Sequence, residues 1–449
     1  MRVMLISANT ITEPYPVYPL GLDYVAGAIA DRHKVQIVDM NATGQNDSLA
    51  KSIREFSPDI IGLSLRNIDN TDTTDPKGFI EVYRKLIEVI RRQSNALIVL
   101  GGSGFTIFPA ESLGVLNADY GVIGEGERLA LLLDAIETGK DATVVPGIIT
   151  RRNRTPLPAP WDKHLHRNFN ANHSHLRFYL KSGGMLNLQT KRGCNFKCIY
   201  CTYPHIEGRH QRLIDPAEVA DTALQLQATG AKYLFVTDSA FNSDYAHNIA
   251  VARAFKKAGV SIPWGAFFVP TKPPADYFRI LADAGLTHVE FGTESLSDDV
   301  LASYRKPFRV PHVFHAHQAA IDAGLNVAHY FLLGGPGEDP ATLKETLNRV
   351  QKLKKSVSFF FCGMRIYPYT QLYDIALKEG QISKNQSILA PVFYRPASID
   401  TDEIIRQVKA QAQNRLNWVI GSGGSEAAGI IARLYERGHT GPLWEYLIH

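Results

Sequence analysis

Short apolar runs alternate with amphipathic stretches along the first 150 residues. The apolar runs predict strands over 3–7, 35–38, 60–65, 96–100 and 120–123. Between them, apolar side chains recur at helical spacing and predict helices over 21–31, 49–55, 79–92 and 129–136. This alternation predicts a doubly wound parallel sheet, in which ligands bind beyond the carboxyl ends of the strands.

The pattern is lost over 151–180, where Pro156, Pro158 and Pro160 lie among Asn, His and Arg residues. Such a stretch indicates a linker or an irregular wrap between domains. From about residue 186 the alternation returns, with strands expected over 186–190, 233–236, 264–268, 288–291, 326–332 and 356–364. The helices expected between them cover 216–228, 243–258, 274–284, 298–301, 310–323 and 340–353.

Six β/α units predict a (β/α)6 partial barrel, whose active site would lie at the C-terminal strand ends. The expected fold class is α/β. A Rossmann-like doubly wound domain would cover 1–150, a linker 151–180, the partial barrel 181–385, and a small, mostly helical C-terminal cap 386–449.

Composition narrows the function classes. The chain has 449 residues, 45% of them hydrophobic, so it can build two or three packed domains. A net charge of +4 without obvious clustering does not suggest nucleic-acid binding. No apolar run reaches the ~18–20 residues of a membrane span, and the first residues lack the long apolar core of a signal peptide. We therefore expect a cytoplasmic protein that binds neither nucleic acid nor membrane.

Three of the four cysteines form the pattern C-x3-C-x2-C: Cys194, Cys198 and Cys201. They directly follow the first strand of the second half, and three thiolates so close together can converge on one soft metal centre. A structural zinc site would need a fourth ligand, for which His205 is the nearest choice. An iron–sulfur cube normally takes four cysteines, so three would leave one iron open. Cys362, in an apolar strand, is expected to pack there.

The cysteine pattern in the loop after the first barrel strand resembles the radical S-adenosylmethionine (SAM) superfamily. Later strand ends resemble landmarks of that family in order, at 237–242, 291–295, 333–338 and 365–368. In this family the open iron of a [4Fe-4S] cluster chelates SAM, and an electron from the cluster cleaves a C–S bond, usually giving a 5′-deoxyadenosyl radical. The match covers roughly residues 186–380.

The resemblance implies roles for individual residues. Cys194, Cys198 and Cys201 would be the cluster ligands. Tyr200 would face the adenine, and Glu294 would bind the amino group or ribose of SAM. Four further positions complete the implied SAM site: Gly335 and Gly337 through close backbone approach, and Asp238 and Ser239 where many members carry Gly-Gly-Glu.

A Rossmann-like domain before such a barrel resembles the cobalamin-binding subfamily. The similar strand-end loops are 19–22, 62–64, 101–104 and 124–127, and the implied cobalamin contacts are Asn67, Gly102, Ser103, Gly104, Gly124 and Gly126. The chain lacks the Asp-x-His-x-x-Gly motif that supplies a histidine ligand to cobalt. We expect Arg66 below the corrin instead, where it could not ligate cobalt because guanidinium has no lone pair to donate.

The resemblance implies a cobalamin-dependent radical SAM C-methyltransferase, in which a methyl group passes from SAM through methylcobalamin to a carbon of a small-molecule substrate. Expected substrate contacts include Phe267, Tyr330, Arg365 and Tyr367, and the expected electron donor is a reductase, a flavodoxin or a ferredoxin. Two alternatives use the same cofactors: cyclisation or rearrangement without methyl transfer, and polar methyl transfer. A third, from another class, is a zinc-stapled binding or regulatory protein.

Overall fold

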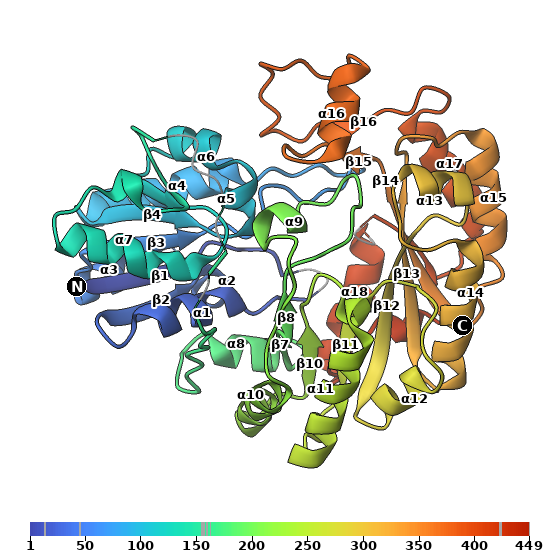
Figure 1. Cartoon of the computed structure of the whole chain (residues 1–449), viewed down its shortest axis with the longest axis horizontal. Coiled ribbons are helices and arrows are strands. Elements are labelled where there is room, and N and C mark those ends of the chain that lie inside the picture. Colours follow the sequence, from blue (N-terminus) through green and yellow to red (C-terminus); the bar gives the residue numbers. More distant parts are fainter. Residues whose placement is uncertain are drawn as a thin grey trace.

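The computed structural model of the chain describes residues 1–12, 15–44, 46–153, 158, 160–161, 163–421 and 424–448. Two α/β domains lie side by side, and the loop that carries the cysteines runs between them with helix α9 (Tyr203–Ile206) (Figure 1). Within the described residues, no helix is long and apolar enough to cross a membrane.

The N-terminal domain is built on a six-stranded sheet in the order β2-β1-β3-β4-β5-β6. Its strands are β1 (Arg2–Ser7), β2 (Lys34–Asp39), β3 (Ile60–Ser64), β4 (Leu97–Gly101), β5 (Tyr120–Val122) and β6 (Ile148–Thr150), parallel except for β6. The sequence predicted the five parallel strands, but not the antiparallel edge strand β6. Its three residues are too few to show a period.

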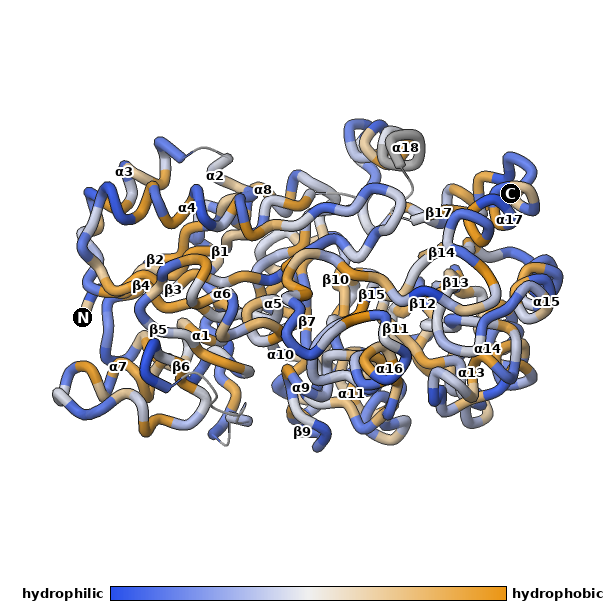
Figure 2. The backbone as a smooth tube through the Cα atoms, turned by 90° about the horizontal axis from the view of Figure 1, so that it is seen from above, coloured by the Kyte–Doolittle hydropathy of each residue, from blue (hydrophilic) through white to orange (hydrophobic). Residues whose placement is uncertain are grey.

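Helices cover both faces of this sheet because alternate strand residues point to opposite sides. Met4 and Ile6 pack beneath α3 (Asn46–Phe56) and α4 (Ile80–Gln93), whereas Val3 and Leu5 pack against α1 (Leu20–Ile29) and α7 (Leu129–Glu137). Figure 2 shows these two helical layers on either side of the apolar strands. The shorter elements of the domain are α2 (Met40–Thr43), α5 (Ser103–Ile107), α6 (Pro109–Val115), η1 (Gly126–Arg128) and η2 (Ala142–Val144).

The second domain is a seven-stranded parallel sheet in the order β17-β14-β13-β12-β11-β10-β7. The strands are β7 (Met185–Leu188), β10 (Tyr233–Val236), β11 (Trp264–Phe268), β12 (Leu286–Glu294), β13 (Asn326–Leu333), β14 (Ser356–Cys362) and β17 (Trp418–Ile420). The edge strands β7 and β17 are not paired with each other, so the barrel is open, as the fold class predicted.

The helices of the barrel are α10 (Pro216–Ala228), α11 (Tyr245–Ala258), α12 (Tyr277–Ala282), α13 (Asp298–Ser303), α14 (Val310–Asp322) and α15 (Pro340–Val350). They lie close to the expected ranges. On β12, Val289 and Phe291 point outward into the core beneath these helices, whereas Glu290 and Glu294 belong to the inner face. The inner face is therefore the place for polar chemistry.

The C-terminal region is mostly helical, as expected, but it also adds a strand to the barrel sheet. Besides α17 (Thr401–Ala412) and α18 (Gly424–Glu436), it contributes β17, which pairs with β14 and extends the barrel sheet. The expected boundary at residue 385 therefore does not coincide with the end of the sheet. The remaining elements are α8 (Leu176–Lys181), β8 (Lys191–Arg192), β9 (Arg212–Leu213), η3 (Phe241–Ser243), β15 (Met364–Arg365), α16 (Gln371–Lys378), β16 (Phe393–Tyr394) and η4 (Trp444–Leu447).

Part of the predicted linker over 151–180 lies outside the described residues. Its later part holds the two domains together, because Arg167 forms a buried ion pair with Asp23 of α1 at 2.9 Å and also donates to the Asn187 carbonyl of β7 at 2.9 Å. Two residues that were expected to contact the substrate also join the two domains. Arg365 and Tyr367 both bind Asp69 of the N-terminal domain, at 2.9 Å each, so the structure places them at the domain interface.

Candidate functional site

The three cysteines of the C-x3-C-x2-C pattern lie on one loop between β8 and α9. All three thiols are free; Cys194 is buried, and Cys198 and Cys201 are half-buried. Burial, together with the neighbouring Cys198 and Cys194, raises the pKa of Cys201 to about 12, in keeping with thiols that lie near one another. Among the described residues, no three His, Cys, Asp or Glu side chains already stand in a metal-binding arrangement.

The donor set nevertheless fits an iron–sulfur cube. It offers three soft thiols on a short loop, and such a cube needs cysteine thiolates. His205, the fourth ligand that a zinc site would require, stacks on Tyr369 with the ring centroids 4.0 Å apart and the planes 7° apart. Three thiols without a fourth protein ligand leave one corner of a cube for a non-protein molecule.

A buried ion pair supports the start of this loop. Asp238 accepts hydrogen bonds from the Thr190 backbone at 2.8 Å and from Lys191 Nζ at 2.9 Å. Both side chains of the ion pair are almost fully buried. Asp238 therefore holds the two residues just before the loop, and its direct contact with SAM stays a prediction. The hydroxyl of the neighbouring Ser239 reaches the Gly193 carbonyl, at 3.4 Å.

Glycine is required at position 193, where the loop turns. Its φ is +88°, and a Cβ there would lie 2.1 Å from the His210 carbonyl oxygen. No other residue fits such a contact without moving the backbone.

Two predicted SAM-site residues meet at the inner face of the barrel. The Tyr200 hydroxyl donates to Glu294 Oε1 at 2.7 Å, and Lys306 Nζ donates to the same oxygen at 3.1 Å. Burial alone would lower the pKa of Lys306, but Glu294 and Cys198 raise it above its ordinary value, so the amine stays charged. Nothing in the sequence marked Lys306, because it follows a short helix and belongs to no motif.

The two glycines after β13 differ in what requires them. A Cβ on Gly335 would lie 2.5 Å from Tyr304 Oη and 2.5 Å from Met364 Cε, so protein packing alone already demands glycine there. Gly337 has a φ of +84° and faces only Ser303. Contact of either glycine with SAM stays a prediction.

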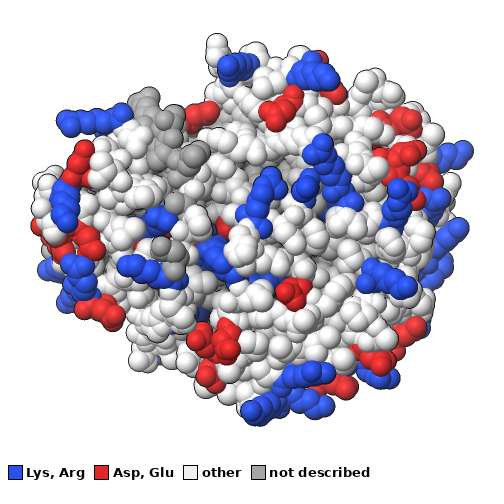
Figure 3. Space-filling view, in the orientation of Figure 1, with Lys and Arg blue, Asp and Glu red and all other residues white. Residues whose placement is uncertain are grey.

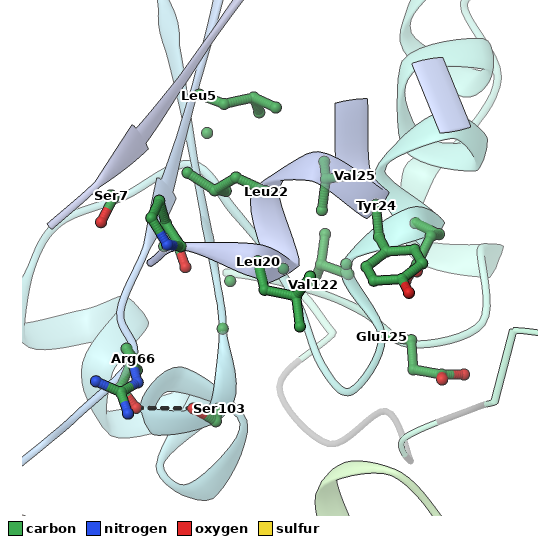
Figure 4. Close-up of a pocket in the computed structure, with 18 of the residues that line it drawn as sticks. Leu5, Ser7, Leu20, Leu22, Tyr24, Val25, Arg66, Ser103, Val122 and Glu125 are labelled. Carbon is green, nitrogen blue, oxygen red and sulfur yellow. Dashed lines mark hydrogen bonds between the residues drawn. The ribbon is translucent and has the colours of Figure 1, made fainter. Parts of the chain in front are cut away.

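A cavity of about 330 Å³ lies at the carboxyl ends of β1, β3, β4 and β5, against the barrel. Figure 4 shows Leu5, Leu22 and Val122 along its apolar part, and Arg66 and Ser103 together at another end. The Ser103 hydroxyl donates to the Arg66 carbonyl at 2.8 Å. The predicted residues Gly102, Gly124 and Gly126 line the cavity as well.

The remaining predicted cobalamin contacts lie beside the cavity. Gly104 packs against the backbone, where a Cβ would come within 2.9 Å of the Leu65 carbonyl oxygen. The Asn67 carbonyl accepts a hydrogen bond from Tyr83 at 2.6 Å. Both residues therefore shape the loop after β3 and do not line the cavity itself.

The cavity suits a corrinoid. Its apolar part fits the aromatic base of a nucleotide tail, and its polar end fits amide side chains. At Gly21 a Cβ would meet nothing within 4 Å, and at Gly101 it would meet only a carbonyl at 3.9 Å, so small residues keep this space open. None of the described residues that line the cavity is a histidine, and Arg66 is exposed within it. The lining therefore offers no imidazole ligand to cobalt.

Ion pairs that the sequence did not reveal join the cavity to the cysteine loop. Arg192, two residues before Cys194, pairs with Glu125 at 2.9 Å and with Glu127 at 2.8 Å. Arg212 pairs with Glu125 at 2.7 Å. Glu125 and Glu127 line the cavity, so these pairs fix the cavity relative to the loop.

Comparison with known proteins agrees with this geometry. Residues 6–133 match the model of the B12 binding domain, and residues 188–350 match that of the radical SAM superfamily. The chain is 24% identical to tryptophan 2-C-methyltransferase of Streptomyces laurentii, over 82% of this chain and 73% of that one. It is 22% identical to cytidylyl-2-hydroxyethylphosphonate methyltransferase of Streptomyces wedmorensis, over 84% and 80% of the two chains.

Among solved structures, the chain is similar to TsrM, a radical SAM methyltransferase from Kitasatospora setae solved with cobalamin and a [4Fe-4S] cluster bound. The TM-score is 0.89 at 21% identity, and the match covers 99% of this chain and 97% of that one. The likeness confirms the predicted fold, a B12-binding domain followed by a radical SAM domain.

Proposed function

We propose that this chain, which joins a B12-binding domain to a radical SAM domain, is a methyltransferase that transfers a methyl group from SAM to a carbon of a small-molecule substrate, with cobalamin as the carrier. Two chains similar to this one over most of its length, the tryptophan and the cytidylyl-2-hydroxyethylphosphonate enzymes, are methyltransferases by name.

One observation carries the proposal. Tyr203, Ile206 and Glu207, which directly follow the last cysteine of the loop, line the cavity of the B12-binding domain. A cluster on the loop and a corrinoid in the cavity would therefore lie on either side of α9. Binding both cofactors at one interface is what a reaction that uses both requires.

When bound, the cluster supplies electrons for the cleavage of SAM, and cobalamin carries the methyl group. The protein's own residues bind and orient the cofactors and SAM. Cys194, Cys198 and Cys201 would hold the cluster, and Glu294, held by Tyr200 and Lys306, would accept hydrogen bonds from SAM. Arg66 would occupy the lower side of the corrin without ligating it.

We further propose an acidic one-electron donor of the flavodoxin or ferredoxin class as partner. A second cavity, of about 250 Å³, opens beside Cys198 and Cys201, and Lys197, Arg209 and Arg305 line it together with no described acidic residue. These three side chains are exposed. Figure 3 shows Lys and Arg side chains over the middle of the face drawn there. Reduced thiols and such a donor call for a reducing compartment, for which we propose the cytoplasm.

Growth of a deletion strain and its parent on methionine with a deuterated methyl group tests the function. We expect a metabolite in the parent that carries the intact label and is missing from the deletion strain. A missing metabolite without label would overturn methyl transfer and indicate cyclisation or rearrangement. With purified protein, a labelled product formed without 5′-deoxyadenosine would indicate polar transfer.

A further inference from the structure

A row of aromatic rings crosses the inner face of the barrel sheet. Phe235 of β10 lies edge-on to Phe267 of β11, with centroids 5.0 Å apart, and Phe267 lies 6.1 Å from Tyr330 of β13. Tyr330 stacks on Phe359 of β14, with centroids 4.8 Å apart and planes 12° apart. Rings from four strands therefore form one continuous wall.

This wall is partly open, unlike the opposite face of the same strands. Phe267 is 39% exposed, and Tyr330 and Phe359 are half-buried. Their sequence neighbours Phe268 and Phe360, which point the other way, are 1% and 0% exposed in the core. Exposed aromatic surface inside a barrel is unfavourable in water and marks a place that a ligand covers.

One polar atom breaks the aromatic wall. The Tyr330 hydroxyl donates its proton to Glu290 Oε2 at 2.9 Å, and Trp444 Nε1 donates to Glu290 Oε1 at 3.0 Å. Glu290 is fully buried. Burial raises the pKa of Tyr330, so the phenol keeps its proton. With that proton committed to Glu290, the phenol oxygen can offer a ligand only its lone pairs.

The wall lies where a substrate of both domains would have to lie. Glu290 shares the inner face of β12 with Glu294, which lies four residues further along the strand, past a bulge and toward the proposed SAM site. Tyr15, from the loop after β1 of the N-terminal domain, packs against the cluster that contains Phe235 of the wall. The wall therefore faces the space between the two proposed cofactor sites.

We infer that the substrate of the proposed methyl transfer is a planar aromatic molecule with an N–H or O–H donor. It lies against Phe267 and Phe359 and donates a hydrogen bond to the Tyr330 oxygen, with Glu290 as the positioning residue for that phenol. This inference rests on the proposed function. A flexible aliphatic chain could cover the same surface, but stacked and edge-on ring contacts favour a flat π-system, and the single acceptor selects a donor on it.

A matched pair of probes tests the inference. Indole is planar and carries one N–H, and 1-methylindole has the same rings without that donor. We would titrate both, by calorimetry, into the full chain loaded anaerobically with iron, sulfide and cobalamin. Indole is expected to bind one site per chain, and 1-methylindole to bind at least about fivefold more weakly, the effect of one lost hydrogen bond.

Two variants and a control localise the binding. The Tyr330→Phe variant should bind the two probes equally. Phe267 lies at a half-exposed position that tolerates change, and Phe267→Leu should weaken the binding of both probes. Tyr446→Phe removes a hydroxyl from a 43% exposed tyrosine outside the wall and should leave both affinities unchanged. The absence of indole binding, or an indole preference that survives Tyr330→Phe, would overturn the inference.

The same preparation separates this inference from the proposed function. Methyl transfer to an aliphatic product, without indole binding, would overturn the aromatic substrate and leave the methyltransferase standing. If the loaded protein binds indole at the wall but transfers no methyl group, the proposed methyl transfer is overturned and the aromatic binding site stands.

Discussion

Removing the carboxylate of Asp238 tests how the cysteine loop is held. The change Asp238→Asn keeps the shape of the side chain and leaves the Lys191 ammonium, whose side chain is 1% exposed, without its anion. Lys191 Nζ would retain the neutral Phe241 carbonyl, at 2.6 Å, and the Phe241 ring, whose centroid is 5.2 Å away. Leaving one partner of a buried ion pair uncompensated costs about 3–5 kcal/mol, so we expect the free energy of unfolding to fall by that amount.

Urea denaturation of the wild-type and variant proteins measures this loss, and iron content after anaerobic loading measures its effect on the loop. The double variant Lys191→Met with Asp238→Asn removes both charges and should recover most of the lost stability, because replacing a whole buried pair is often nearly neutral. A loss below about 1 kcal/mol in the single variant, or no recovery in the double variant, would refute the reasoning.

Three further predictions address other parts of the site. Burial raises the pKa of Glu207 from 4.5 to about 7. The cofactor-free protein should therefore lose on the order of 3 kcal/mol of unfolding free energy between pH 4.5 and pH 8, relative to Glu207→Gln. Equal pH profiles of the two proteins in urea titrations would contradict this. Gly102→Ala would place a Cβ 2.7 Å from a backbone oxygen at φ +96°, and we expect it to abolish cobalamin binding, measured by equilibrium dialysis. The control Gly139→Ala, whose Cβ would meet nothing within 4 Å, should cost only about 1–2 kcal/mol of stability and retain cobalamin binding. Lys306→Met removes the cation that holds the Glu294 carboxylate in place and should weaken SAM binding at least about tenfold in filter assays; unchanged affinity would contradict this positioning role.

Much of the fold could be predicted from the sequence because the strands are buried on both faces and bounded by turns. The run Tyr233–Val236 and the helix Pro216–Ala228 lie where the pattern placed them. The strand β17 could not be found in this way. Three residues show no period, and only pairing with β14 in the folded chain makes them a strand.

The site was predictable where a motif fixes several residues at once, as in the cysteine loop. The residues that support this loop and the SAM site could not be predicted. Lys306 and Arg192 act through partners distant in sequence, Glu294 and Glu125, and no spacing rule connects them. Asp238 was recognised as a strand-end residue, but only the fold shows that its oxygens face Lys191.

The metal content of the anaerobically loaded chain tests the central claim most directly. We expect about four iron atoms per chain, near-equimolar cobalt, and loss of the iron but not of the cobalt in Cys198→Ala. A wild-type chain that holds zinc in place of iron, or that takes up no cobalt when offered cobalamin, would contradict the account.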